Sequence, residues 1–197
     1  MNKSYKDLKS RMYISPDKFN SMISDLAIKI KRENYTPDII VVVERAGFAM
    51  IRPLLDIFVD VDYDTCRIKY YKGVGEKSDK PEIITRLRDE NRVSGKKILA
   101  IEECTDTGKT SQLLKNYLER LGAKEVKIGV LFHKYSSSFE PDWFVKRTNK
   151  WIYFYYETLE AAKDLMKNKG MNLEEVLNHF REVGIPEEEL LRLRQLI

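Results

Sequence analysis

Short, continuous apolar runs alternate along this chain with segments of helical periodicity. The runs Ile39–Val43 and Ile98–Ile101 contain no polar position, which is typical of strands that are buried on both faces. In residues 15–34 the apolar side chains instead recur at steps of three and four, and Ser15 and Pro16 supply a helix start. Strands that alternate with helices predict an α/β fold, a mostly parallel twisted sheet with helices on both faces.

The remaining elements follow from the same patterns. Further strands are expected at 63–71, 125–134 and within the aromatic segment 141–157, and further helices at 48–58, 109–123 and beyond Thr158. Residues 72–82 combine two glycines, a proline and dense charge, which predicts a mobile surface loop, and 82–87 is a candidate strand returning from it. A length of 197 residues favours one domain, expected at 1–168, with a C-terminal helical extension at 169–197.

Charge and hydropathy argue against several classes of partner. Lys and Arg are interleaved with Asp and Glu and the net charge is only +4, so the basic stripe of a nucleic-acid-binding protein is absent. No apolar run approaches the ~18 residues of a membrane span, and the polar N-terminus lacks the apolar core of a signal peptide. Cys66 and Cys104 form neither a disulfide framework nor a metal-binding pattern. We therefore expect a cytoplasmic protein with no nucleic-acid or membrane partner.

The segment KKILAIEECTDTGKTSQLL, residues 96–114, places two adjacent acids at the end of a buried strand. Its GKT ending suggests a nucleoside-triphosphate loop, but Glu103 stands where that motif needs its first glycine, so this class of site is excluded. A polar strand-to-helix turn, in which Thr105 or Thr107 caps the helix, is the simpler alternative. Glu102 and Glu103 argue against a merely structural turn, because adjacent carboxylates repel each other unless a cation or hydroxyl donors lie beside them.

This arrangement suits a phosphorylated sugar. Successive backbone N–H groups at a helix N-terminus favour a phosphate dianion, and Gly108 lets the backbone approach it closely. Thr105, Thr107 and Thr110 add hydroxyl groups. The acid pair would accept hydrogen bonds from sugar hydroxyls, directly or through Mg²⁺. The segment therefore predicts a site for both ends of a ribose 5-phosphate.

The stretch ILAIEECTDTGKTS resembles the phosphoribosyl pyrophosphate (PRPP) motif of the type I phosphoribosyltransferases. That motif is an apolar strand, two acids, two variable residues and then Asp-Thr-Gly-x-Thr, here Asp106–Thr110. The family's acid pair usually contains an aspartate, whereas both acids are glutamates here. A second likeness is the turn Arg45-Ala46-Gly47 after the first strand, which is similar to the family's pyrophosphate-binding loop; otherwise Arg45 is a surface arginine. The resemblance implies Mg²⁺ as cofactor and PRPP-binding residues Arg45, Ala46, Glu102, Glu103, Thr105, Asp106, Thr107, Gly108, Lys109 and Thr110.

The resemblance extends to the 6-oxopurine branch of the family, in its archaeal type. By this likeness Lys134 donates to the purine O6, Trp151 stacks on the base and the backbone of Ile152 reads the base edge, whereas the structural alternative is a solvated lysine and a core tryptophan. Glu157 would contact Mg²⁺ through a water molecule. Glu102 and Glu103 would contact it mostly through the PRPP hydroxyls. His133 is expected to point to the face opposite Lys134.

The implied activity is transfer of the phosphoribosyl group of PRPP to hypoxanthine, guanine or xanthine, which gives the nucleoside 5'-monophosphate and pyrophosphate in purine salvage. Asp106 would be the catalytic residue, acting at purine N7, and residues 70–82 would form a lid. A homodimer or larger homo-oligomer is expected from the resemblance. Three alternatives stay open: a PRPP-binding regulator of the same fold, a phosphoribosyltransferase for another base, and an interaction protein that recruits a partner through its C-terminal helices.

Overall fold

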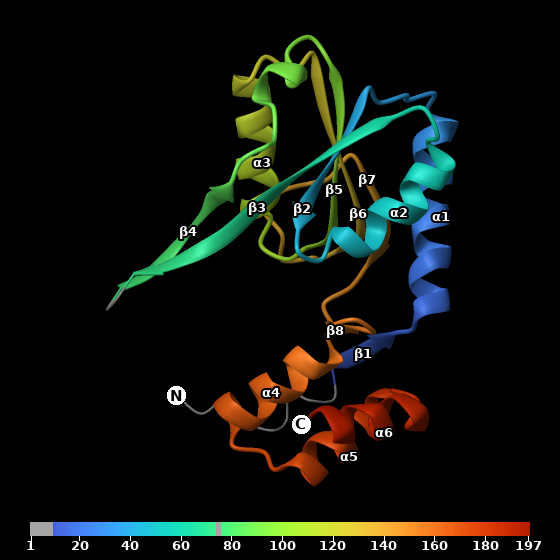
Figure 1. Ribbon diagram of the computed structural model, residues 1–197, viewed down its shortest axis with the longest axis vertical. Helices are drawn as coiled ribbons and strands as arrows, with labels where there is room; N and C mark the ends of the chain where they lie inside the picture. Colours follow the sequence, from blue (N-terminus) through green and yellow to red (C-terminus); the bar gives the residue numbers. More distant parts are fainter. Residues whose placement is uncertain (1–9, 74–75) are drawn as a thin grey trace. The chain divides into compact units, whose positions relative to one another are not determined.

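The computed structural model describes residues 10–73 and 76–197. The chain forms two compact units (Figure 1). The larger unit comprises residues Asn20–Thr148, and the smaller unit joins the residues up to Phe19 to Asn149–Ile197. The predicted boundary at residue 168 lies inside the smaller unit, so the division into 1–168 and 169–197 stays a prediction.

A six-stranded sheet forms the centre of the larger unit, in the order β4-β3-β2-β5-β6-β7. Neighbouring strands run parallel except for the pair of β3 and β4, which confirms the predicted α/β fold with a mostly parallel sheet. The strands are β2 (Ile39–Glu44), β3 (Asp62–Gly73), β4 (Glu76–Thr85), β5 (Lys97–Thr105), β6 (Glu125–His133) and β7 (Trp143–Arg147).

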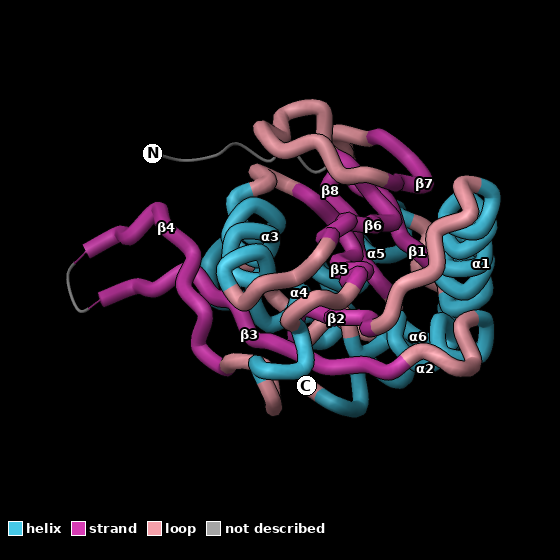
Figure 2. The backbone as a smooth tube through the Cα atoms, turned by 90° about the horizontal axis from the view of Figure 1, so that it is seen from above, coloured by secondary structure: helices cyan, strands magenta, loops and turns pink. Residues whose placement is uncertain are grey.

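Helices cover both faces of this sheet (Figure 2). The helix α3 (Lys109–Arg120) covers one face, where Leu114 and Leu118 join a buried cluster with alternate residues of β2 and β5. The helices α1 (Pro16–Arg32) and α2 (Phe48–Ile57) lie on the other face. A short 3₁₀ helix, η2 (Glu90–Val93), precedes β5. Apolar contacts on both faces explain why Ile39–Val43 of β2 and Ile98–Ile101 of β5 contain no polar residue.

The smaller unit has its own sheet and its own core. The strands β1 (Arg11–Ile14) and β8 (Trp151–Phe154) pair in parallel. Three helices follow, α4 (Thr158–Lys169), α5 (Leu173–Val183) and α6 (Glu187–Leu196). Their apolar faces bury Phe180, Leu190 and Leu193 in one cluster with Tyr153. This agrees with the helical pattern predicted beyond Thr158.

The prediction of a surface loop at 72–82 is wrong for the described residues of that segment. Lys72 and Gly73 end β3, and residues 76–82 belong to β4, so the segment is part of an antiparallel hairpin. The strand β4 has a partner on only one side, and such an edge tolerates charged residues and Pro81. Val74 and Gly75 lie outside the described residues. Among the residues that the structure describes, no helix is long and apolar enough to cross a membrane.

Candidate active site

The order of the strands locates the candidate site. The chain leaves β2 towards β3 on one side and leaves β5 towards β6 on the other, so the connections diverge between β2 and β5. Ligands of open α/β sheets bind at such a point, beyond the carboxyl ends of the strands. Three segments named above share this edge of the sheet, because they follow or end three adjacent parallel strands: Arg45–Gly47, Glu102–Thr110 and His133–Lys134.

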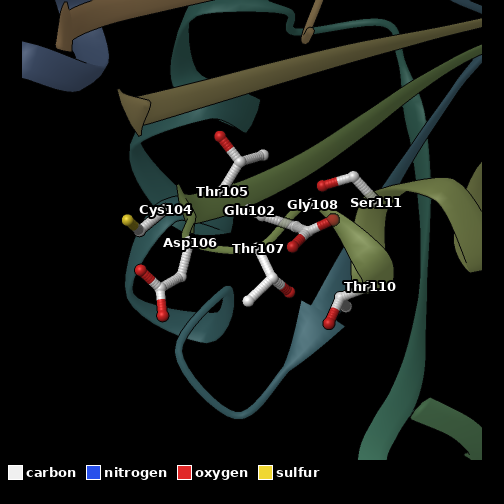
Figure 3. Close-up of a pocket in the computed structure, with 8 residues that line it drawn as sticks. All are labelled: Glu102, Cys104, Thr105, Asp106, Thr107, Gly108, Thr110 and Ser111. Atoms are coloured by element: carbon white, nitrogen blue, oxygen red, sulfur yellow. The ribbon is translucent and has the colours of Figure 1, made fainter. Parts of the chain in front are cut away.

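A pocket of about 300 Å³ opens at the end of β5. Its lining comes from one continuous segment, the last residues of β5 and the first turn of α3 (Figure 3). Asp106 and Thr107 are exposed and Thr105 is buried, and Figure 3 shows the Thr105 side chain pointing away from those two. The lining residues are Glu102, Cys104, Thr105, Asp106, Thr107, Gly108, Thr110 and Ser111. Lys109, the remaining predicted PRPP residue of this segment, is exposed at the start of α3.

Gly108 is required in the turn for two reasons. Its φ of 81° lies in the left-handed region, which side chains disfavour. A Cβ atom at this position would also lie 2.4 Å from Cβ of Phe139 and 2.7 Å from Oγ of Ser137. The turn therefore packs directly against the loop that follows β6, and the glycine makes this approach possible.

The same loop orients the peptide groups of the turn. The backbone N–H of Lys134 donates to the carbonyl of Thr105 at 3.0 Å, and the N–H of Ser138 donates to the carbonyl of Thr107 at 3.1 Å. In a trans peptide the N–H points opposite to the carbonyl. The N–H groups of Asp106 and Gly108 consequently point away from this loop. Backbone N–H groups that share a direction before a helix form the arrangement that binds phosphate.

Glu102 is buried, with 5% of its surface exposed. Desolvation raises the pKa of Glu102 to about 8; the Ser111 hydroxyl lowers it and the charge of Glu103 raises it further. The acid pair therefore carries less than its full charge at neutral pH, which relieves the repulsion between adjacent carboxylates. The Oε1 atom of Glu102 has no hydrogen-bond partner among the described residues. It can accept from a sugar hydroxyl of a ligand in the pocket.

The donor set fits a magnesium ion that keeps most of its ligands from water and substrate. Glu102 and Glu103 offer hard carboxylate oxygens, which Mg²⁺ prefers. The described part of the chain holds no cluster of three or more His, Cys, Asp or Glu side chains that could cage a metal by itself. Cys104 lines the pocket, and burial raises the pKa of its thiol to about 12, so it is a poor nucleophile and metal ligand at neutral pH.

The loop after β2 has a tightly packed turn. A Cβ atom on Gly47 would lie 2.5 Å from the carbonyl oxygen of Val43, so a side chain cannot be accommodated there without movement. The peptide between Glu44 and Arg45 is cis, and Arg45 is exposed. Ala46 is half-buried.

The predicted base-binding residues belong to both units. Lys134 is buried in the larger unit, where only 8% of it is exposed. Trp151 and Ile152 lie in β8 of the smaller unit, where Trp151 is 60% exposed and Ile152 is buried. Glu157 follows β8 in the same unit and is half-buried.

Sequence reasoning missed the contacts of one residue in each unit, His133 in the larger unit and Arg11 in the smaller one. The ring of His133 lies between Thr105 and Glu140, and the sequence did not indicate either partner. Arg11 places its guanidinium 5.9 Å from the centre of the Trp151 ring, since β1 pairs with β8. Both contacts depend on strand pairing between distant segments, which no local pattern reports.

Comparison with known proteins assigns the family. A family model described as the phosphoribosyl transferase domain matches residues 16–156. The chain is 27% identical to a hypoxanthine-guanine phosphoribosyltransferase of Schistosoma mansoni over 71% of its length, and 34% identical to phosphoribosyltransferase domain-containing protein 1 of Xenopus laevis over 44%. It spans 53% and 39% of the lengths of these two relatives.

Solved structures give the same result. A purine phosphoribosyltransferase from Pyrococcus horikoshii is 32% identical, with a TM-score of 0.65 over 74% of this chain and 92% of that one. A xanthine-guanine-hypoxanthine phosphoribosyltransferase from Helicobacter pylori, 23% identical, shares the fold with a TM-score of 0.63 over 82% of this chain and 99% of that one. The match of the family model to more than half of the chain, at the segment that forms the pocket, shows that this protein belongs to the phosphoribosyl transferase domain family.

Proposed function

We propose that this protein transfers the phosphoribosyl group of PRPP to a 6-oxopurine base. One observation carries the proposal: the end of β5 brings the buried acid Glu102 and a phosphate-type turn into a single pocket, at the point where the strand connections diverge. Hypoxanthine, guanine and xanthine are the candidate bases. The names of the relatives from Schistosoma mansoni and Pyrococcus horikoshii support a purine as acceptor.

Each part of PRPP has a partner in this proposal. The turn at Thr105–Thr110 holds the 5'-phosphate, and Glu102 and Glu103 accept hydrogen bonds from the ribose hydroxyls. Arg45 and the backbone near Ala46 hold the pyrophosphate. When bound with PRPP, Mg²⁺ supplies positive charge against the leaving pyrophosphate.

The reaction breaks the bond from C1' of the ribose to the pyrophosphate oxygen and forms a bond from C1' to a purine nitrogen. Positive charge develops on the ribosyl group as the leaving group departs, and preorganised donors around the pyrophosphate stabilise the transition state. Asp106, exposed at the mouth of the turn, takes the proton at purine N7 or stabilises it. The transfer needs no covalent intermediate on the enzyme, in accord with the weakly acidic thiol of Cys104.

The assigned base-binding residues are Lys134, Trp151 and Ile152. A lysine donor favours O6 of a 6-oxopurine over the amino group of adenine, which is itself a donor. Lys134 has this role here, Trp151 provides a stacking surface and the backbone of Ile152 reads the base edge. Glu157 reaches the magnesium ion through water.

Pyrophosphate release with PRPP, Mg²⁺ and single bases tests the proposal. We expect turnover with at least one of hypoxanthine, guanine and xanthine, and none with adenine or uracil. Asp106→Asn should reduce turnover by about 10²-fold while PRPP still binds, since a positioned acid–base group contributes rate rather than affinity. Release with uracil alone would favour a pyrimidine enzyme. Calorimetric binding of PRPP without turnover of any base would favour a regulator, and no binding at all would refute a PRPP site.

A further inference from the structure

A buried histidine lies directly behind the candidate phosphate site, and the proposed chemistry does not use it. His133 ends β6, is 2% exposed and stands beside Lys134. Its Nδ1 atom lies 2.8 Å from Oγ1 of Thr105, and its Nε2 atom lies 3.0 Å from Oε2 of Glu140. The ring packs on Phe144, with 5.3 Å between ring centres. Both nitrogens are thus engaged, and the ring is held on three sides.

The partners determine which ring nitrogen carries the hydrogen. Glu140 also pairs with Arg147. Desolvation tends to raise the pKa of this carboxyl, but the hydrogen bond from His133 and the charge of Arg147 outweigh it, so the pKa of Glu140 is lowered. A carboxylate can only accept, so Nε2 of His133 donates to Glu140. In the neutral ring Nδ1 then accepts, and the hydroxyl of Thr105 is the donor to it.

This hydrogen bond separates Thr105 from the other threonines of the turn. Thr107 is exposed and Thr110 is half-buried, whereas Thr105 is 1% exposed and its hydroxyl is hydrogen-bonded to Nδ1 of His133. The carbonyl of Thr105 accepts from the backbone N–H of Lys134. His133 therefore holds the side chain of Thr105, and the next residue, Lys134, holds its backbone.

We propose that His133, oriented by Glu140, is a positioning residue that fixes the turn at Thr105–Gly108 for the phosphate of PRPP. Because His133 and Lys134 are consecutive, the same anchor sets the backbone of the lysine assigned to the base. The inference rests on the proposed function, since it assumes that the turn binds PRPP.

Three substitutions at one position separate positioning from packing. Asn places a polar atom near the position of Nδ1 and can keep the bond to Thr105. Gln places its polar atom near Nε2 and can keep the bond to Glu140 but not the bond to Thr105. Phe keeps the ring shape and loses both bonds, which leaves the Thr105 hydroxyl buried without a partner.

The measurement is calorimetric affinity for PRPP with Mg²⁺, together with thermal unfolding of each variant. We expect His133→Phe and His133→Gln to weaken PRPP binding by about tenfold, the effect of losing one buried hydrogen-bond partner, and His133→Asn to stay within about threefold of the wild type. In turnover assays we expect KM for PRPP to rise more in the Phe and Gln variants than in the Asn variant, with a smaller change in kcat. Rescue by Asn but not by Gln is an order that loss of packing alone does not predict.

A surface variant keeps the test decisive if the His133 variants fold poorly. Glu140 is exposed, so Glu140→Ala should preserve the fold and weaken PRPP binding about threefold through a less well oriented ring, while the exposed control Glu33→Ala should have no effect. Equal affinity of Glu140→Ala and Glu33→Ala, or equal losses for the Asn and Gln variants, overturns the inference alone. Absence of PRPP binding by the wild-type protein overturns the proposed function, and this inference with it.

Discussion

At the scale of single residues, Gly108 is a position where one added methyl group is expected to affect both stability and PRPP binding. We expect Gly108→Ala to lower the free energy of unfolding by about 2 kcal/mol, from positive φ and from contact with Phe139, and to weaken PRPP binding at least tenfold. Urea unfolding and calorimetry measure the two effects.

Gly95 provides a matched control for this substitution. Its φ is 73°, similar to that of Gly108, but a Cβ atom there would meet nothing within 4 Å. Gly95→Ala therefore reports the cost of the backbone conformation without the contact. If both variants lose the same stability and both bind PRPP normally, the packing of the turn against Phe139 has no role in binding.

The buried acid Glu102 makes stability depend on pH. Its pKa of about 8 in the folded protein is above the ordinary value of a glutamate, so between about pH 4.5 and 8 the folded protein holds a proton that the unfolded chain releases. The stabilising contribution is complete below this window and is lost as the pH rises through it. We expect the free energy of unfolding of the unliganded protein to fall from pH 5 to pH 8, by at most about 1.4 kcal/mol per pH unit from this group.

Glu102→Gln isolates the contribution of this group, because the amide has nearly the same shape and does not titrate. Urea unfolding of both proteins at pH 5, 6, 7 and 8 gives the difference in stability at each pH. The variant should gain stability relative to the wild type as the pH rises. A difference that stays constant from pH 5 to pH 8 would mean that Glu102 titrates alike in the folded and unfolded chain.

At the scale of elements, helix α5 is a major part of the core of the smaller unit. A capping box of Asn172 and Glu175 starts the helix, and its buried face includes Phe180, which is fully buried 5.2 Å from the ring of Tyr153. Phe180→Ala should cost about 3–5 kcal/mol of stability, since it removes a large apolar side chain and leaves a cavity. The exposed Leu191 in α6 supplies the control, because Leu191→Ala should change stability by less than about 1 kcal/mol. Similar losses in both variants would contradict the assigned packing.

Local patterns predicted those elements whose own residues determine their structure. The buried strands β2 and β5, the helices α1 and α3 and the turn at Gly108 all follow from periodicity, capping and glycine. Pairing between distant segments has no such signal. The strand β1 is only four residues long and was not predicted, and the charged segment 76–82 is a strand because β3 provides its hydrogen bonds. The contact of His133 with Thr105 depends on the register of β5 and β6, so this contact was also not visible in the sequence.

At the scale of the whole molecule, the residues assigned to the two substrates divide unequally between the units. The predicted PRPP residues all belong to the larger unit, whereas Trp151 and Ile152 belong to the smaller one. We expect Trp151→Ala to raise KM for the base about tenfold through the loss of stacking, with unchanged affinity for PRPP. Because Trp151 is 60% exposed, thermal unfolding should change little. Weaker PRPP binding in this variant, or an unchanged KM for the base, would argue against the stacking role.

The parallel pair of β1 and β8 also determines the order in which the chain can assemble. All strands of the six-stranded sheet lie between Ile39 and Arg147, so the ribosome has synthesised them before it reaches Trp151. The strand β1 (Arg11–Ile14) is synthesised before its partner β8, so the two can pair only after the intervening residues have been synthesised. Closing such a long separation in sequence is slow compared with forming local contacts. Nascent chains that stall before residue 151 should therefore carry an unpaired N-terminal strand that is open to chaperones and to other copies of itself.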